Sequence, residues 1–365
     1  MQHGPPGRLD SKRHMFAALS VPLLVLAFVL AAGAVWIAGI WLSGATDILD
    51  DRLHLGAALG GLILLAVATN LPEIAITVSA ALSGHLELAI GNILGGIAVQ
   101  TVVLAVLDAF GLGRRAPLTS LSRSLNLVLE GSLVTAVLMV VIMGAQLPKT
   151  TLWGRLEPGA VVVALLWGVG LWLIGKAKAI PWKTEGPTPT LLPEVQQARQ
   201  RQEERNKSVS TARAVLTFGV AALVTLGAGL VLALSGEALA GHLHLSGVLF
   251  GATVLAVATA LPEISTGLAS VRLGDYELAV SDIFGGNAFL PVLFLLASLI
   301  SGQAVLPQLQ RSDLYLTALG VLLTAVYLYG LVFRSRRQWG LLGLDSWAVI
   351  CLYAVGLFGL WVLAR

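Results

Sequence analysis

Two glutamates, Glu73 and Glu263, stand deep inside long apolar stretches of the sequence. Each directly follows a proline, and a threonine stands four residues earlier, at Thr69 and Thr259. A spacing of four residues places the hydroxyl and the carboxylate on one face of a helix. An ionisable side chain at such depth in a membrane segment is costly and usually marks a functional site. The pattern therefore predicts a polar site that is built twice from the same residue types.

Further polar side chains belong to the same pattern. Asn92 follows Glu73 by the same distance along the chain as Asp282 follows Glu263. Carboxylate, amide and hydroxyl oxygens are hard ligands that suit Ca²⁺ or Na⁺, whereas a zinc site would need His or Cys. We therefore expect a site for transported inorganic cations and no resident cofactor. The predicted ligands are Glu73, Glu263, Thr69, Thr259, Asn92, Asp282, Asn70 and Asn287.

The two copies of the pattern are parts of an internal repeat. A shift of 190 residues aligns Gly61–Ala98 with Gly251–Ala288 without gaps, with identity at 18 of 38 positions. Pro72 and Pro262 stand at the same offset, and each interrupts a long apolar run beside its glutamate. Proline inside a helix frees a backbone carbonyl. The repeat therefore predicts two broken helices, each with carbonyl oxygens next to a carboxylate.

The elements that position these residues are membrane helices. Of 365 residues, 56% are hydrophobic and 12% are charged, which excludes an ordinary soluble domain. The single cysteine, Cys351, excludes a disulfide-built module. The apolar runs are about 20 residues long, which fits membrane helices rather than barrel strands. Ten spans are predicted: Phe16–Leu42, Leu55–Leu82, Leu86–Phe110, Leu125–Gly144, Gly159–Gly175, Ala214–Leu234, Leu245–Val271, Leu278–Ile300, Leu314–Phe333 and Trp347–Leu363.

Ten spans divide into two groups of five. Residues 1–175 form the first five-helix repeat, 176–213 a polar cytoplasmic linker, and 214–365 the second repeat. Because five is odd, the second repeat must be inverted relative to the first. Inverted repeats are typical of secondary transporters, which bind their substrate near the midplane where the halves meet. The fold class expected is thus an all-α polytopic membrane protein with two inverted five-helix repeats.

Basic residues in the loops predict the orientation. If the amino terminus lies outside, 16 of the 23 Lys and Arg residues fall on the inner side. The positive-inside rule therefore favours both termini outside, although Arg8, Lys12 and Arg13 favour the opposite orientation. The net charge of +3 is ordinary for a membrane protein and indicates a lipid-bilayer partner rather than nucleic acid. The chain offers no prediction of oligomeric state.

At this level the motifs resemble those of the sodium/calcium exchanger family, within the cation/Ca²⁺ antiporter superfamily. AVATNLPE and AVATALPE are similar to the family's G-T-S-x-P-E core, and GNILGG and SDIFGGNAF to its G-N-x-x-G-S-N-x-F segment. The resemblance implies ten helices in two inverted halves and exchange of a cation for Ca²⁺ by alternating access. By motif position it also implies that Glu73 and Glu263 are central ligands, Thr69 and Thr259 lie beside them, and Asn92 and Asp282 lie across from them.

Several alternatives stay open at this stage. Asn70 and Ala260 stand where the family has serine, and Gln100 where it usually has asparagine. Fewer hydroxyl ligands favour H⁺ as the coupling ion, whereas the resemblance favours Na⁺, and Mn²⁺ or Mg²⁺ could replace Ca²⁺. A cation channel or passive pore is the main alternative from another class, and an enzyme is disfavoured because no nucleophile is evident. The absence of a long regulatory domain suggests a prokaryotic plasma membrane.

Overall fold

The fold was analysed in a computed structural model that describes residues 15–53, 66–113, 115–152, 154–177 and 193–363. Among these residues, nine helical segments are long and apolar enough to cross a membrane, and a tenth apolar helix, α4 (Leu71–Ser83), is shorter. α4 is the second part of the predicted span Leu55–Leu82, whose residues 55–65 lie outside the described residues. The prediction of an all-α membrane protein is confirmed.

The first half contains α2 (Val21–Leu53), α4, α5 (Leu86–Val106), the π-helical turn η1 (Leu107–Leu112), α6 (Leu118–Leu121), α7 (Leu125–Gly144) and α8 (Pro158–Ala177). A polar helix, α9 (Pro193–Ser208), lies in the linker. The second half contains α10 (Thr211–His242), α11 (Gly247–Phe250), η2 (Gly251–Leu255), α12 (Ala256–Thr259), α13 (Leu261–Arg272), α14 (Tyr276–Phe289), η3 (Leu290–Val292), α15 (Leu293–Ser301), η4 (Leu306–Gln308), α16 (Arg311–Phe333), the paired strands β1 (Gln338–Trp339) and β2 (Leu342–Gly343), and α17 (Leu344–Leu363).

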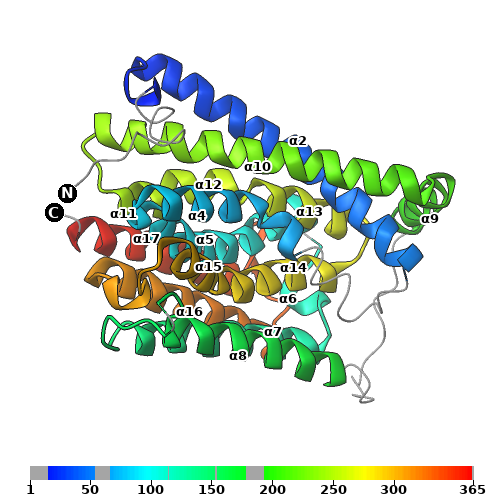
Figure 1. The fold of residues 1–365 in the computed structure, drawn as a ribbon. Helices are drawn as coiled ribbons and strands as arrows, with labels where there is room; N and C mark the ends of the chain where they lie inside the picture. The colour runs from blue at the N-terminus through cyan, green and yellow to red at the C-terminus, as the bar shows by residue number, and fades with distance from the viewer. Residues whose placement is uncertain (1–14, 54–65, 114, 153, 178–192, 364–365) are drawn as a thin grey trace, which may run out of the picture.

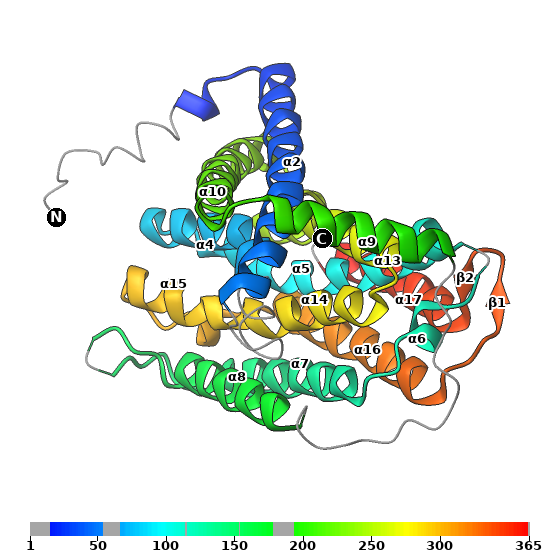
Figure 2. The same cartoon turned by 90° about the vertical axis from the view of Figure 1, so that its right-hand side faces the viewer.

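α2 and α10 are longer than the sequence predicted. They contain 33 and 32 residues, whereas the predicted spans were Phe16–Leu42 and Ala214–Leu234. At 1.5 Å per residue each helix is roughly 50 Å long, well beyond the ~30 Å hydrocarbon core. The hydropathy of the chain predicts only the apolar middle of such a helix, because helix formation continues past the point where polar residues begin. Figures 1 and 2 show the two helices side by side along one side of the bundle.

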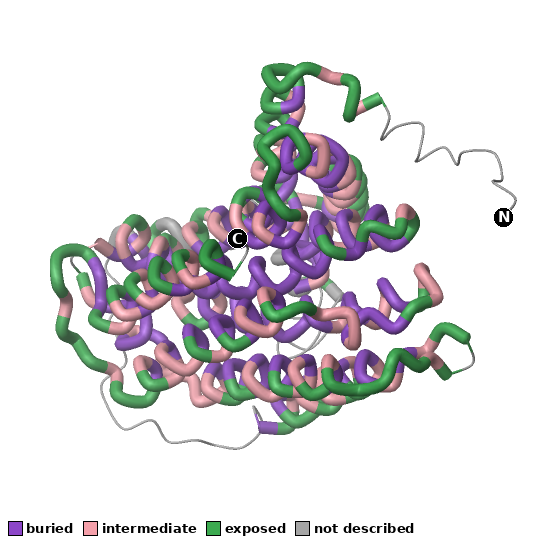
Figure 3. Tube along the Cα trace, turned by 90° about the vertical axis from the view of Figure 1, so that its left-hand side faces the viewer, coloured by how far each residue is buried: buried purple, intermediate pink, exposed green. Residues whose placement is uncertain are grey.

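The contact between α2 and α10 is apolar on its inner side. Leu24 and Val35 of α2 and Leu232 of α10 are fully buried, and the ring of Phe28 packs edge-on against Phe250, with centroids 6.0 Å apart. The outward side of the same helices exposes large apolar side chains, which Figure 3 shows as exposed segments on this pair. Exposed apolar surface of this extent fits contact with lipid.

α5 is the most enclosed helix of the bundle, with 18 of its 21 residues buried. Its glycines allow the backbone of the other half to approach closely. A Cβ at Gly91 would lie 2.7 Å from the carbonyl oxygen of Val248, and one at Gly95 would collide with the backbone of Ala252. Small residues at such positions are the usual basis of close helix packing in membranes. α5 therefore packs closely against α11 and η2.

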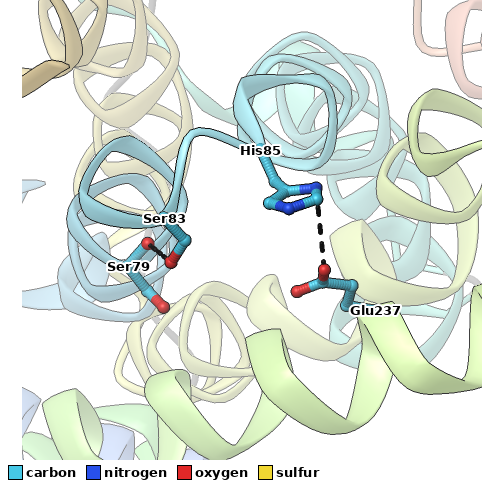
Figure 4. A network of polar contacts seen from close by, with 4 residues as sticks. All are labelled: Ser79, Ser83, His85 and Glu237. Atoms are coloured by element: carbon cyan, nitrogen blue, oxygen red, sulfur yellow. Dashed lines mark hydrogen bonds and ion pairs between the residues drawn. The ribbon is translucent and has the colours of Figure 1, made fainter. Parts of the chain in front are cut away.

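The turns that follow the two glutamate helices lie at opposite ends of the bundle. The α4–α5 turn brings His85 to 3.7 Å from Glu237, near the end of α10, as Figure 4 shows. The end of α13 brings Arg272 to the same cavity as Arg213, near the start of α10. Residues 213 and 237 of one helix are about 36 Å apart. This is the relation that an inverted repeat requires. We call the end that carries α9 the linker face and the opposite end the far face.

A buried carboxylate, Glu157, fixes the chain on the far face, just before α8. It accepts hydrogen bonds from the Ser298 hydroxyl (2.7 Å) and from the backbone N–H groups of Val305 (2.7 Å) and Leu306 (3.0 Å). Burial raises the pKa of Glu157 above its ordinary value of 4.5 because the charged form is desolvated. The group thus takes up a proton at higher pH in the folded protein than in the unfolded chain.

This pKa shift predicts a pH dependence of stability. Since the folded state binds the proton more tightly, the contribution of Glu157 to the free energy of unfolding is largest below pH 4.5 and falls as pH rises through the raised pKa. The melting temperature of the wild type should fall relative to that of Glu157→Gln as pH is raised from 4 to 8 in detergent. Parallel curves for the two proteins would contradict this assignment.

Candidate cation-binding site

Both predicted broken helices are present in the structure. The helix from residue 66 is interrupted at Asn70, before α4, and α12 is interrupted at Ala260, before α13. Because proline has no N–H, Pro72 and Pro262 leave the carbonyls of the residues four positions earlier without their helical donors. Glu73 and Glu263 therefore lie in the first turns of α4 and α13. The positive end of a helix dipole favours a carboxylate there.

The two glutamates are completely buried, and three of their four carboxylate oxygens lack a hydrogen-bond partner among the described residues. Within the described residues, neither oxygen of Glu73 and not Oε2 of Glu263 has a hydrogen bond, and both side chains are 0% exposed. Their charges lie close enough to repel each other, and Asp282 also repels Glu263. An unpaired carboxylate in a dry interior is very costly. A bound cation or a proton is the natural way to offset that cost.

Beside the two glutamates, polar side chains from one half of the protein contact polar side chains from the other half. The hydroxyl of Thr259, in the second half, donates to the amide oxygen of Asn92, in the first (3.3 Å). Thr259 also approaches the carboxylate of Glu73, and Thr69 approaches that of Glu263. Each glutamate thus faces the threonine of the other repeat. The sequence pattern predicted that each threonine neighbours the glutamate of its own repeat. The contact with the glutamate of the other repeat becomes evident only in the assembled fold.

Asp282 is held by a residue that the sequence analysis did not select. The hydroxyl of Thr266 donates to Oδ2 of Asp282 (2.5 Å) and to the carbonyl oxygen of Glu263 (3.2 Å). Oδ1 of Asp282 has no hydrogen-bond partner within the described residues. At the position equivalent to Thr266 the first repeat has Ile76, and there Asn92 replaces the acid. The sequence did contain a signal for this contact, because both members of the pair differ between the repeats: Ile and Asn in the first become Thr and Asp in the second.

Gln100 is the second residue that sequence reasoning missed as a ligand. Its amide nitrogen donates to Oε1 of Glu263 (3.2 Å) and to the amide oxygen of Asn70 (3.4 Å), so it bridges the two broken helices. Its own oxygen, Oε1, has no partner within the described residues. Asn70 is anchored in turn by a hydrogen bond to the carbonyl of Ala66 (2.6 Å). Gln100 therefore supplies a further neutral oxygen beside the carboxylates.

Asn287 lies apart from the carboxylates. Its amide nitrogen donates to the hydroxyl of Thr101 (3.1 Å), which donates in turn to the carbonyl of Ile97 (2.7 Å). Its Oδ1 is buried and has no partner within the described residues. The structure thus joins seven of the eight predicted residues through direct contacts or electrostatic repulsion and places Asn287 in a separate pair with Thr101.

Two other buried carboxylates differ from those of the candidate site, because their oxygens accept hydrogen bonds. Asp108 accepts hydrogen bonds from the N–H groups of Leu118 (2.6 Å) and Gly343 (3.0 Å) and from the hydroxyl of Ser346 (2.6 Å). Glu157 is satisfied in the same way. These carboxylates hold loops in place and have no free oxygen to offer. Unsatisfied oxygens therefore distinguish Glu73, Glu263 and Asp282 from carboxylates that serve the structure.

The donor set defines what the site can hold. Within the described part of the chain, no three His, Cys, Asp or Glu side chains come close enough to form a metal site on their own. A cation here would be held by the carboxylates together with neutral oxygens from amides, hydroxyls and freed carbonyls. Such mixed oxygen sets suit Ca²⁺ and Na⁺.

A scan against protein-family models supplies an independent result. The model described as "Sodium/calcium exchanger protein" matches residues 23–175 and 213–362, in two blocks that correspond to the two halves. The chain belongs to the sodium/calcium exchanger protein family. The unmatched interval contains the polar linker, including α9. The family resemblance of the motifs is thereby confirmed.

Known proteins resemble this exchanger-family chain in sequence or in fold. The inner membrane protein YrbG of Escherichia coli (strain K12) is 33% identical over 101 residues, which are 27% of this chain and only 31% of YrbG. The structure of the H⁺/Ca²⁺ exchanger CAX has a TM-score of 0.65 at 14% identity and covers 96% of this chain and 89% of CAX. The sodium-calcium exchanger NCX_Mj, soaked with 2.5 mM Na⁺ and 1 mM Sr²⁺, has a TM-score of 0.58 at 16% identity, with 92% and 98% coverage.

One large cavity of this family member lies toward the linker face. The cavity has a volume of about 1070 Å³ and lies between α2, α9, α10 and α13. Its walls include Arg213 and Arg272 near the linker face and Thr266 at the inner end. Because Thr266 donates to Asp282, the cavity ends one side chain from the carboxylate set. Toward the far face, α5 packs closely against α11 and η2.

Gln100 provides a direct test of the site geometry. Gln100→Leu keeps the volume of the side chain but removes both of its hydrogen bonds and its free oxygen. Leaving two buried acceptors unpaired costs about 1–3 kcal/mol, so we expect cation affinity to fall about tenfold or more. The measurement is the cation concentration for half-maximal transport. The same change at the exposed Gln146 is the control, and equal effects of both variants would contradict the assignment.

Proposed function

We propose that this protein is a secondary active antiporter that exchanges Ca²⁺, or a similar divalent cation, for Na⁺ or H⁺ by alternating access. The observation that carries the proposal is the pair of buried, unsatisfied glutamates at two broken helices from opposite halves. Membership of the sodium/calcium exchanger family supports it, as does the fold shared with proteins named as H⁺/Ca²⁺ and sodium-calcium exchangers.

The proposed ligands are the two glutamates and the polar groups that surround them. Glu73 and Glu263 balance the charge of a divalent ion, and neutral oxygens complete its shell. Asp282 adds a third negative charge, which a proton or a paired group must neutralise. The proposed set is Glu73, Glu263, Thr69, Thr259, Asn70, Asn92, Asp282 and Gln100, with Asn287 further away. Inorganic cations are the substrates, and the proposal includes neither catalysis nor a resident cofactor.

The shape of the bundle supports alternating access rather than a pore. Among the described residues, the cavity near the linker face includes Thr266 in its lining, whereas toward the far face α5 packs closely against α11 and η2 at Gly91 and Gly95. A channel would need a continuous path when open, whereas a carrier needs access from one face at a time. We propose that this structure represents the state in which the site opens to the linker face.

The coupling ion is the least determined part of the proposal. Sodium needs several oxygens per ion, and Asn70 and Ala260 replace hydroxyls that the family uses. Gln100 offsets part of this loss, because its free Oε1 lies beside Glu263. Proton coupling needs only the carboxylates. Both ions therefore stay in the proposal, and Mn²⁺ or Mg²⁺ stays as an alternative divalent substrate.

Flux measurements under separate gradients test the coupling. The purified chain is reconstituted into liposomes, and ⁴⁵Ca²⁺ uptake is measured under a Na⁺ gradient at clamped pH and, separately, under a pH gradient without sodium. Uptake under either gradient supports exchange and names the coupling ion. Uptake that depends on neither the Na⁺ gradient nor the pH gradient, and only on the Ca²⁺ gradient, would refute coupled exchange and favour the passive pore.

We also propose that the linker face is cytoplasmic and that both termini lie outside, in a prokaryotic plasma membrane. The basic residues counted above support this orientation. Single cysteines on a Cys351→Ala background test it. A cysteine at His85 should react with an impermeant maleimide from outside the cell, and one at Asp275 only after the membrane is opened. Reaction of both cysteines from the same side would refute the inverted arrangement.

A further inference from the structure

A second cavity lies at the far face, at the end of the bundle opposite the linker. Its volume is about 470 Å³, and it is lined by the starts of α5 and α16, the end of α10 and the segments that connect them. Three of its lining residues are acidic, namely Glu87, Glu237 and Asp313, against one lysine, Lys149. The cavity thus has an excess of acidic over basic side chains.

Asp313 is the residue in this cavity that lacks a complete set of partners. It is only 2% exposed. Its Oδ2 accepts a hydrogen bond from the backbone N–H of Gln310 (2.7 Å), which caps α16. Its Oδ1 has no partner within the described residues. Glu87 lies near enough to repel it electrostatically. Helix capping uses only one oxygen of Asp313, so the other oxygen is available to a cation, which would also offset the repulsion between the two acids.

The cavity also contains a pair of facing side chains, His85 and Glu237. Nδ1 of His85 lies 3.7 Å from Oε1 of Glu237, and Figure 4 shows the two side chains pointing toward each other. The neighbouring Ser83 hydroxyl is already used, because it donates to the carbonyl of Ser79. His85 and Glu87 are exposed and Glu237 is partly exposed, so Asp313 is the buried acid of this cavity.

We propose that this far-face cavity is a second cation site, which binds a hydrated divalent ion such as Ca²⁺ and supplies it to the transport site. A volume of 470 Å³ has room for an ion with its water shell, at roughly 30 Å³ per water. Glu87 precedes Asn92 by five residues of α5, about 7–8 Å along the helix axis. An ion held here is therefore close to the transport site but separated from it by the packed glycines of α5.

Direct binding tests this site without any transport. The double variant Glu73→Gln/Glu263→Gln removes the charges of the transport site, and Mn²⁺ binding to the purified full chain is followed by electron paramagnetic resonance. We expect one residual weak site. Adding Glu87→Gln should weaken it at least threefold, and adding Asp313→Asn should do the same. Absence of residual binding, or residual binding that neither change weakens, would overturn the proposal.

The matched control comes from the repeat itself. Glu277 is the counterpart of Glu87 in the second half and lies toward the linker face, where its carboxylate accepts from the backbone N–H of Arg123. Glu277→Gln should leave the residual Mn²⁺ site unchanged. Equal weakening by Glu277→Gln would show only a loss of net charge and would overturn the assignment to the far-face cavity.

A kinetic measurement adds the functional consequence, and it rests on the proposed antiport. With Ca²⁺ supplied from the far face, Glu87→Gln should raise KM about three- to tenfold at low ionic strength, with unchanged kcat and a smaller effect at high salt. Ca²⁺ supplied from the linker face should show no such change. A KM effect from both faces would overturn the recruiting role. If no variant transports but Mn²⁺ binding follows the expected pattern, the proposed antiport fails and the second site stands.

Discussion

Glu73→Gln and Glu263→Gln should each abolish divalent-cation exchange while leaving a folded protein in the membrane. Each change removes one negative charge from a completely buried site and keeps the size of the side chain. Leaving a buried charge unbalanced costs about 3–5 kcal/mol. Each 1.4 kcal/mol is a tenfold change in affinity, so we expect exchange to fall by more than about 100-fold.

The readout for these variants is initial-rate ⁴⁵Ca²⁺ exchange at matched protein amounts, with Glu277→Gln as the control for loss of a carboxylate elsewhere. Folding is checked independently by melting temperature in detergent. It should not fall, because Glu73 has no hydrogen bond to lose among the described residues, and the amide oxygen introduced by Glu263→Gln can still accept the hydrogen bond from Gln100. Near-normal exchange in either glutamate variant would remove that residue from the site.

Gly95→Leu should disrupt the packing between the two halves and destabilise the whole protein. A Cβ at this position would collide with the backbone of Ala252, so α5 and η2 would have to separate. Overpacking costs about 1–3 kcal/mol when side chains can adjust, and a contact between backbones leaves less room for adjustment. We expect little or no monodisperse protein, or a melting temperature at least several degrees lower.

The control for this prediction is Gly33→Leu in α2. A Cβ at Gly33 meets nothing within 4 Å, and this glycine is exposed on the outer side of α2. Gly33→Leu should therefore leave the melting temperature unchanged. A Gly95→Leu protein as stable as Gly33→Leu would show that α5 and η2 are not packed as described.

The repeat explains why much of the site could be predicted from the sequence. Thr69, Pro72 and Glu73 recur at a fixed offset, and a proline beside an acid inside an apolar run has few structural explanations. Local chemistry therefore indicated both the broken helices and the central glutamates. Asn92 was among the predicted residues, and in the structure its amide oxygen accepts a hydrogen bond from Thr259.

The remaining parts depend on how the halves fit together. Gln100 stands 27 residues after Glu73 and meets Glu263 instead, and this pairing arises from tertiary packing. The sequence around Thr266 is typical of an ordinary packed helix. Its hydrogen bond to Asp282 is evident only in the folded structure. Helix lengths were also underestimated for α2 and α10, because hydropathy detects the membrane core and helices continue beyond it.

The central claim is obligatory exchange at a site built from both halves. Its most direct test is ⁴⁵Ca²⁺ release from loaded proteoliposomes into medium that contains either an exchangeable cation or only an impermeant one. We predict release in exchange for external Ca²⁺, and with Na⁺ or H⁺ as counter-ion, and no release into the impermeant medium. All release should be absent in Glu73→Gln/Glu263→Gln. Two results would contradict the account. One is rapid, protein-dependent release of ⁴⁵Ca²⁺ into medium that contains only the impermeant cation, and the other is release that persists in the double variant.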